Sequence, residues 1–196
     1  MQKGTFGLLF GLVAAVGMTG MTPPAPGREA GHAAMAVEPA PLMPASELRW
    51  MTLQQAEENG KSEPRVIIMD IYTDWCYWCK VMERNTYSNP ALAAYVAGKF
   101  YPVKFNAESH GPVSWKGQSF GYNSDYKVNE LALNLTRGQL SFPTTVIITP
   151  DDQAPQFISG YLKPAEIEPI LKYFGEGVYK KESYSVFKRT FKSEWK

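Results

Sequence analysis

The chain has 196 residues, which is enough for one ordinary domain with a packed core plus additional segments. Apolar residues make up 44% and charged residues 20%, close to the values of globular proteins, and this composition excludes a chain that is disordered throughout. The formal net charge of +1 gives no strong field that would attract nucleic acid, acidic substrates or an anionic membrane surface. We therefore expect a globular domain that does not bind nucleic acid.

The first part of the chain has the pattern of an export signal. A lysine near the start precedes an uncharged, mostly apolar run over residues 4–20, and the triplet Ala-Met-Ala at 34–36 fits a cleavage site for a signal peptidase. We predict that residues 1–36 are a signal peptide and that the mature protein is periplasmic or secreted. Cleavage near Gly20 and an uncleaved membrane anchor are the alternatives. The Pro- and Ala-rich residues 37–47 predict a linker.

Beyond the linker, helix and strand patterns alternate along the chain. The run from Arg65 to Tyr72 is almost continuously apolar and rich in branched residues, which predicts a strand buried on both faces. Gly60, Gly138 and Gly175 follow helical patterns and predict the ends of helices. This alternation predicts an α/β fold in which helices flank a layered sheet. In chain order we expect helices over 53–59, 76–84, 91–99, 128–135 and 164–174, and strands over 65–72, 100–105, 144–148 and 156–159.

The two cysteines of the chain lie in a single Cys-x-x-Cys motif, at Cys76 and Cys79. The motif stands where a predicted strand is followed by a helix. At the helix N-terminus, unpaired backbone N–H groups and the helix dipole favour thiolate over thiol at Cys76. The spacing of three residues brings Cys79 onto the same helix face, one turn later. We predict that Cys76 is an exposed nucleophile and that Cys79 is a shielded thiol that resolves a mixed disulfide.

Two other interpretations of the cysteine pair are open. The first is a purely structural disulfide, but closing so short a loop removes little chain entropy, roughly 2 kcal/mol. The second is a zinc site, which needs about four ligands, whereas the chain offers only His32 and His110 besides the cysteines. We therefore favour a reversible redox pair and expect no metal.

Residues around the motif, and others farther along the chain, form an ordered set. With this set the chain, from about 48 to 175, resembles the thioredoxin superfamily, specifically its exported members with a Trp-Cys-x-x-Cys-Lys active site. The resemblance implies a thioredoxin-like fold, with a central mixed β-sheet flanked by helices. To this fold we expect the chain to add an insertion before the cis-proline loop and a C-terminal helical tail. The set consists of Asp70 in the strand before the motif, Trp75 and Lys80 flanking the cysteines, the strand Val103-Lys104-Phe105-Asn106, the loop Phe142-Pro143-Thr144, and Gly160 before the last helix.

The resemblance also implies roles for the residues that match. Cys76 attacks and Cys79 resolves, while Asp70 relays a proton to or from Cys79 and Lys104 moderates that acid. Pro143 is expected in the cis form, facing the cysteines. The Phe142 backbone is then left to pair with an extended substrate segment, and Trp75, Tyr77 and Trp78 contribute to the substrate-binding surface. The alternatives are a locally capping Asp70, a solvated Lys104 and an ordinary trans Pro143, since few X–Pro bonds are cis.

The residues between the cysteines depart from the family pattern. Typical thioredoxins carry Gly-Pro there, and strong oxidases and isomerases commonly carry a histidine, whereas this chain carries Tyr77 and Trp78. The absence of a histidine favours a reductase. The inference is modest, because 30 mV corresponds to only about 1.4 kcal/mol for a two-electron couple.

Two segments lie outside the minimal pattern. Residues 106–127 form an aromatic-rich insertion with an expected hairpin over 113–120, and it is either a wall of the substrate groove or a loop that closes its own small core. Residues 176–196 form a basic tail. Aromatic residues at helical spacing in this tail predict an amphipathic helix laid on the domain, with docking to a partner or an acidic membrane as the alternative. These tail residues are Tyr184, Phe187, Phe191 and Trp195.

The leading functional hypothesis is an exported thiol–disulfide oxidoreductase, acting as a protein disulfide reductase through Cys76 and Cys79. Its expected partners are protein thiol or disulfide substrates and an upstream electron-donor protein, with no cofactor, and we expect a monomer. The main alternative is a non-catalytic binding or chaperone module that uses the aromatic insertion and the tail. A peroxidase of the thiol type is a third possibility.

Overall fold

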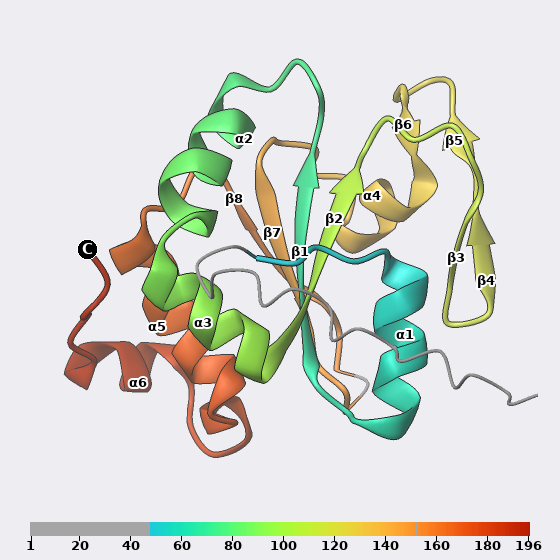
Figure 1. Ribbon diagram of the computed structural model, residues 1–196. Helices are drawn as coiled ribbons and strands as arrows, with labels where there is room; N and C mark the ends of the chain where they lie inside the picture. The colour runs from blue at the N-terminus through green and yellow to red at the C-terminus, as the bar shows by residue number, and fades with distance from the viewer. Residues whose placement is uncertain (1–47, 152) are drawn as a thin grey trace, which may run out of the picture. The chain divides into compact units, whose positions relative to one another are not determined.

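The computed structural model describes residues 48–151 and 153–196 (Figure 1). The predicted signal peptide at 1–36 and the predicted linker at 37–47 lie outside the described residues. Within the described ranges, no helix has the length and apolar character needed to cross a bilayer. The elements, in chain order, are α1 (Leu53–Ser62), β1 (Val66–Tyr72), α2 (Tyr77–Met82), the π-helix η1 (Glu83–Tyr87), α3 (Pro90–Lys99), β2 (Phe100–Asn106), β3 (Val113–Trp115), β4 (Gln118–Phe120), β5 (Tyr122–Asn123), β6 (Val128–Asn129), α4 (Glu130–Leu135), β7 (Thr144–Ile148), β8 (Gln156–Ser159), α5 (Pro164–Gly175), the 3₁₀ helix η2 (Val178–Lys180) and α6 (Tyr184–Thr190).

A four-stranded sheet in the order β2-β1-β7-β8 forms the centre of the domain. β1 and β2 are parallel, and β7 runs antiparallel to both β1 and β8, so the prediction of a mixed sheet is confirmed. Helices α1 and α4 lie on one side of the sheet, whereas α2, α3 and α5 lie on the other (Figure 1). The resulting three layers enclose two apolar clusters, one on each face of the sheet.

Strand β1 supplies side chains to both clusters. Met69 and Ile71 pack into the cluster under α1 and α4, whereas Ile68 packs into the cluster under α3 and α5. Successive residues of a strand point to opposite faces, so burial on both faces requires an unbroken apolar run. The same alternation places Asp70 on the face of Ile68, which is the face covered by α2.

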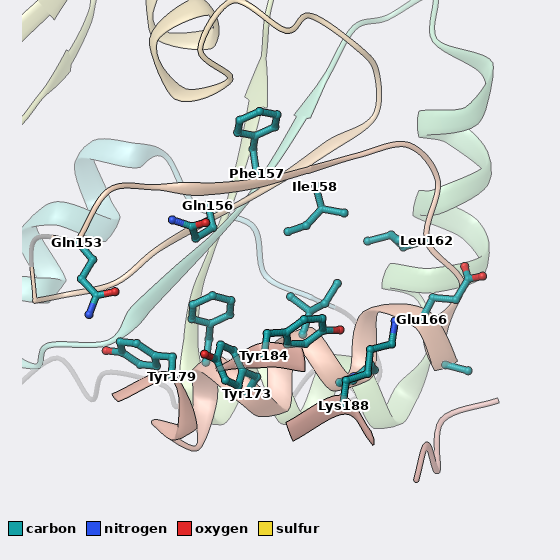
Figure 2. Close-up of a pocket in the computed structure, with 14 residues that line it drawn as sticks. Gln153, Gln156, Phe157, Ile158, Leu162, Glu166, Tyr173, Tyr179, Tyr184 and Lys188 are labelled. Carbon is teal, nitrogen blue, oxygen red and sulfur yellow. The ribbon is translucent and has the colours of Figure 1, made fainter. Parts of the chain in front are cut away.

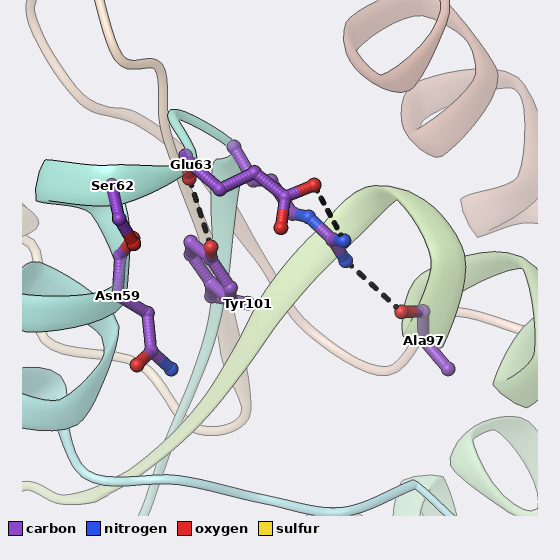
Figure 3. Close-up of polar contacts among 6 residues, drawn as sticks. Asn59, Ser62, Glu63, Ala97 and Tyr101 are labelled. Carbon is purple, nitrogen blue, oxygen red and sulfur yellow. Dashed lines mark hydrogen bonds and ion pairs between the residues drawn. The ribbon is translucent and has the colours of Figure 1, made fainter.

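The start of β1 is held by polar contacts (Figure 3). The Tyr101 hydroxyl on β2 donates to the Glu63 carbonyl at 2.8 Å. The Arg65 guanidinium donates to the Glu63 carboxylate at 2.7 Å and to the Ala97 carbonyl, at the end of α3, at 3.2 Å. These contacts fix the turn between α1 and β1 and thereby set where β1 enters the sheet.

Two of the predicted helix ends are displaced. Helix α1 continues through Gly60 to Ser62, and α5 includes Gly175 and is followed by Gly177 in the left-handed conformation, at φ 69°. Gly175 is therefore the last helical residue, one position beyond the predicted end of the helix. It is a point of close approach between α5 and its neighbours, because a Cβ atom there would lie 2.7 Å from Tyr95 Oη and 2.8 Å from Phe100 Cε2.

We expect Gly175→Ala to lower the free energy of unfolding by roughly 1–3 kcal/mol, since an extra methyl group would overpack this contact. Gly98→Ala is the matched control. No atom lies within 4 Å of the Cβ position at Gly98, and alanine is the better helix former by about 1 kcal/mol. Urea unfolding of both variants checks the prediction, and a Gly175→Ala protein as stable as Gly98→Ala would contradict the close approach.

The insertion forms small sheets and closes one end of the core. The expected hairpin is confirmed, with β3 paired to β4 across Lys116 and Gly117. Trp115 and Phe120 are buried in the cluster under α1, which supports the interpretation of the insertion as a loop that closes a core. Tyr126 remains exposed.

The tail packs against α5, but its helix is shorter than the aromatic spacing predicts. Helix α6 ends at Thr190, and the extended chain beyond it brings Trp195 back into the core cluster under α3 and α5. Glu168, buried on α5, accepts hydrogen bonds from the backbone N–H groups of Glu194 and Trp195, both at 2.8 Å, and from the Ser193 hydroxyl. The Trp195 ring packs against Tyr95 at 5.6 Å between centroids. The end of the tail is therefore an integrated part of the domain.

Candidate active site

Cys76 and Cys79 stand at the junction between β1 and α2, and they form a disulfide of 2.08 Å. Cys76 is the N-cap of α2, and its Sγ accepts a hydrogen bond from the Cys79 backbone N–H at 3.0 Å. Helix α2 runs directly into the π-helix η1, so that the helical segment extends to Tyr87. The location predicted for the pair is therefore observed. The Cys79 N–H, which belongs to the first turn of α2, donates to the Cys76 sulfur and would stabilise negative charge there.

The predicted exposure of Cys76 is wrong for this disulfide-bonded form. Cys76 is 4% exposed and Cys79 is 5% exposed, so neither sulfur protrudes from the surface. The bond to Cys79 and the hydrogen bond to its N–H turn the Cys76 side chain towards the start of α2. An attacking thiol must therefore reach Cys76 past its neighbours in the chain.

Aromatic side chains form the surface around the disulfide. Trp75, Tyr77 and Trp78 are 67%, 66% and 54% exposed, which is unusual for such large apolar groups. Trp75 meets Phe142 edge-on at 6.0 Å between ring centroids, and Trp78 stacks on Tyr161 at 5.6 Å. This aromatic surface contains the residues predicted from the sequence together with Tyr161. Tyr161 was not predicted, although it directly follows Gly160, which belongs to the family pattern.

The turn before Cys76 is tied to the start of the insertion. The Trp75 indole N–H donates to the Glu108 carboxylate at 2.9 Å, and the Asn106 side chain donates to the Asp74 carboxylate at 3.2 Å. Glu108 was also missed, because no local pattern links it to the motif 33 residues earlier. These contacts orient the Trp75 ring beside the disulfide.

The loop before β7 carries the expected cis bond. The peptide between Phe142 and Pro143 is cis, which confirms the prediction for Pro143. The Pro143 carbonyl accepts a hydrogen bond from the Gly160 N–H at 2.8 Å, and Gly160 adopts a φ of +98° that other residues rarely reach. The contact of Phe142 with Trp75 places this loop next to the aromatic surface.

Asp70 lies beneath the disulfide, in a cavity of about 330 Å³ that Cys79, Glu83 and Lys104 also line. Its carboxyl is buried, and Oδ1 has no hydrogen-bond partner among the described residues. Burial raises the pKa of Asp70 to about 7, although the positive charge of Lys104 opposes the shift. The cavity therefore places a carboxyl that can exchange a proton near neutral pH on the inner side of Cys79.

Lys104 is held beside Asp70 by the pairing of β1 with β2, in which the two residues are partners. Its Nζ forms an ion pair with Glu83 and lies over the rings of Trp50 and Tyr72, at 5.5 and 5.1 Å from their centroids. Burial lowers the pKa of Lys104, and the negative charge of Asp70 opposes this shift. Sequence reasoning missed Glu83, although it stands four residues after Cys79 and hence on the same helix face.

Replacing Lys104 with glutamine should raise the pKa of Asp70 above 7, because it removes the positive charge that opposes the effect of burial. A titration followed by NMR at the Asp70 carboxyl carbon measures this shift. Lys80→Gln is the matched control, since Lys80 lines the same cavity but contributes nothing to the shift. An unchanged or lower pKa of Asp70 in Lys104→Gln would show that the two residues are not coupled.

In the described part of the chain, no three or more His, Cys, Asp and Glu residues are grouped so that they could hold a metal ion. His110 stacks on Tyr122 at 3.9 Å between ring centroids. The observed site consists of a disulfide, an aromatic surface and a buried carboxyl.

A family model and several known proteins resemble this chain. The family model described as Thioredox_DsbH, protein of unknown function, DUF255, matches residues 43–174. An uncharacterized Caenorhabditis elegans protein, B0495.5, is 26% identical over 98 residues, which cover half of this chain but only 12% of the longer relative. Among solved structures, a DsbH oxidoreductase is 18% identical with a TM-score of 0.48, over 68% of this chain and 90% of that one. Chloroplastic thioredoxin z is 21% identical with a TM-score of 0.44, over 67% and 96% of the two chains.

The fold is thioredoxin-like, with a mixed sheet between two layers of helices and a helical C-terminal tail. The family match and the Cys76–Cys79 pair together support a thiol–disulfide oxidoreductase at this general level. The chain belongs to the thioredoxin-like family whose model is described as Thioredox_DsbH, DUF255.

Proposed function

We propose that this protein is an exported protein disulfide reductase that works by dithiol–disulfide exchange through Cys76 and Cys79. The observation that carries the proposal is the closed Cys76–Cys79 disulfide at a helix N-terminus with the Asp70 cavity directly behind Cys79. The redox domain spans residues 48–175, and the tail at 176–196 packs onto it. Export rests on the signal pattern of residues 1–36.

In the first step, the Cys76 thiolate of the reduced protein attacks a substrate disulfide. A bond forms between Cys76 Sγ and one substrate sulfur, the substrate disulfide breaks, and the leaving thiolate takes a proton from solvent. In the second step, the Asp70 carboxylate accepts the Cys79 proton through the cavity that both groups line. The Cys79 thiolate then attacks Cys76 Sγ, closes the internal disulfide and releases the second substrate thiolate. Two electrons pass from the protein to the substrate, and an electron-donor protein restores the dithiol.

The residues between the cysteines favour the reducing direction. A histidine there would stabilise the reduced form and make the protein a stronger oxidant, and this chain has Tyr77 and Trp78 instead. The exposed aromatic surface fits a protein substrate, whose apolar segments it can cover. A reduction potential measured against glutathione checks the direction, and a value as oxidising as that of a disulfide-introducing enzyme would reverse the assignment.

Reduction of insulin tests the function. Protein that has been reduced and freed of reductant should precipitate the insulin B chain, Cys76→Ser should lose this activity, and Cys79→Ser should accumulate mixed disulfides because it cannot resolve them. Oxidised wild-type protein is the control. Equal insulin reduction by wild type and Cys76→Ser would refute the mechanism.

In the alternative of a non-catalytic binding module, aromatic residues of the insertion and the tail would bind the partner. Trp115, Phe120 and Trp195 are buried in the core, so that they are not available to a partner. Tyr126 of the insertion is exposed, but the larger exposed aromatic group, Trp75, Tyr77 and Trp78, flanks the disulfide, and this arrangement supports the reductase.

A further inference from the structure

We propose that the outer edge of β8 and the groove beside it form a docking site for an extended segment of the client protein, apolar in the middle and acidic at its end. This inference rests on the proposed function, because it supplies the reductase with a second contact to its client. The site is separate from the disulfide and from the aromatic surface around it.

The first observation is that β8 has an unused edge. It is the last strand of the sheet, paired only to β7. The Gly160 N–H donates to the Pro143 carbonyl, and antiparallel partners alternate between bonded and non-bonded pairs, so Ile158 and Gln156 bond to β7. The N–H and C=O groups of Phe157 and Ser159 therefore point outward, and among the described residues they have no hydrogen-bond partner. Such an edge can pair with an added strand.

The second observation is a groove that runs along this edge. Its volume is about 720 Å³, and its walls come from β8, α5 and the tail. Figure 2 shows Ile158 on one side of the groove and Tyr173, Tyr179 and Tyr184 on the other, whereas the Phe157 ring points to the opposite face of β8. Apolar and aromatic side chains at an open sheet edge are what a strand needs to bury its alternate side chains.

The charge of the groove favours a segment with an acidic end. Lys188 lines it from α6, and residues 179–196 carry six Lys or Arg against two Glu. The acidic lining residue Glu166 lies on a different element from Lys188, in the first turn of α5, where its carboxylate accepts the Lys163 backbone N–H at 2.8 Å. An acidic side chain near the end of the added segment would therefore meet positive charge.

The position of the edge identifies the occupant as a client. β8 ends at Ser159, the next residue bonds to Pro143, and Tyr161 stacks on Trp78 beside the disulfide. A segment paired with β8 therefore continues towards Cys76. A polypeptide can bridge the groove and the disulfide in this way, whereas a small molecule held in the groove cannot.

Binding of a labelled peptide to the oxidised full chain tests the site. The probe is a short peptide that alternates threonine with valine or phenylalanine and ends in aspartate, and its affinity is measured by fluorescence anisotropy. Two further probes carry N-methyl groups on alternate backbone amides, in either phase. One phase should bind as the parent does and the other about tenfold or more weakly, because only alternate amides face the β8 edge.

Variants locate the binding. Ala165→Trp, on an exposed lining position of α5, should fill the groove and weaken binding about tenfold or more, whereas Ala94→Trp, exposed on α3 outside the groove, should not. Lys188→Glu should weaken the aspartate probe and improve a probe that ends in lysine. Lys192→Glu makes the same change in net charge outside the groove. It should shift the relative affinities of the two probes much less than Lys188→Glu does.

Each outcome has a distinct meaning. Peptide binding that is insensitive to Ala165→Trp and to both methylation phases overturns the docking site while insulin reduction, and with it the proposed function, stands. Binding as expected in a protein that fails to reduce insulin supports the site and refutes the reductase. A sedimentation experiment that shows a dimer dissociated by Ala165→Trp, without peptide binding, overturns the proposal and assigns the edge to a second copy of the chain.

Discussion

Asp70→Asn should make the stability of the oxidised protein far less dependent on pH and should slow the release of substrate from the mixed disulfide. The wild-type carboxyl is buried beneath Cys79, and its pKa is raised to about 7 from the ordinary value of 3.8. The Asp70 carboxyl ionises at a lower pH in the unfolded chain than in the folded protein. Its burial therefore lowers the free energy of unfolding at every pH at which the unfolded chain is ionised.

The direction in which stability changes with pH follows from the pKa values of Asp70 in the folded and unfolded states. Below about pH 4 the carboxyl is protonated in both states, and its full contribution to stability is present. As the pH rises through about 7, the unfolded chain ionises first and wild type should lose about 4 kcal/mol of unfolding free energy, at about 1.4 kcal/mol per pH unit. Above the pKa of Asp70 in the folded protein, the loss of unfolding free energy stays constant. The Asp70→Asn protein has no such proton to lose, so it should be the more stable of the two at alkaline pH.

Urea unfolding across this pH range measures the difference, with Asp125→Asn as the control because Asp125 is exposed. The kinetic effect is measured in a single turnover, in which decay of the mixed disulfide should slow by about 10²-fold, the lower range for loss of a general base. A variant whose stability falls with pH as steeply as that of wild type would show that Asp70 is not the buried titrating group.

Glu168→Ala should lower the free energy of unfolding by about 3 kcal/mol. The Glu168 carboxylate is buried and accepts the N–H groups of Glu194 and Trp195. Hydrogen bonds to a charged group contribute about 1.5–3 kcal/mol each, and their loss leaves buried donors without a partner. The tail can escape part of this cost by detaching, but it then withdraws the buried Trp195 ring from the core.

A double-mutant cycle separates the two contributions. Trp195→Ala alone should cost about 3–5 kcal/mol, and the double variant should cost clearly less than the sum, because either change releases the same segment. Glu194→Ala is the control, since Glu194 contributes its backbone N–H and its side chain is exposed. Strict additivity in the cycle would mean that Glu168 and Trp195 do not act as one anchor.

Local patterns predicted much of the fold because the relevant physics is local. The apolar run of β1 needs burial on both faces wherever it is placed, and Pro90 starts α3 behind the Asn89 cap, whose side chain accepts two N–H groups of the first turn. The cysteine pair was likewise predicted at the start of a helix. The cis bond at Pro143 was predicted from family resemblance, since no local preference requires it.

Features that depend on tertiary contacts could not be predicted. The aromatic spacing of the tail suggests one helix through Trp195, but the helix stops at Thr190 because the chain turns back to Glu168. The ion pair of Lys104 with Glu83 joins segments 21 residues apart. Cys76 was expected to be exposed because a helix N-terminus is usually open, and only the closed disulfide shows how far its side chain is turned inward.

The burial of both sulfurs has a consequence for exchange with small thiols. Glutathione or free cysteine offers little surface to Trp75, Tyr77 and Trp78, and the 4% exposure of Cys76 leaves it a narrow approach. A protein partner that packs against those rings gains binding energy with which to open that approach. We therefore expect the disulfide to exchange slowly with low-molecular-weight thiols and, under the proposed function, its redox state to be set by its protein substrates and electron donor.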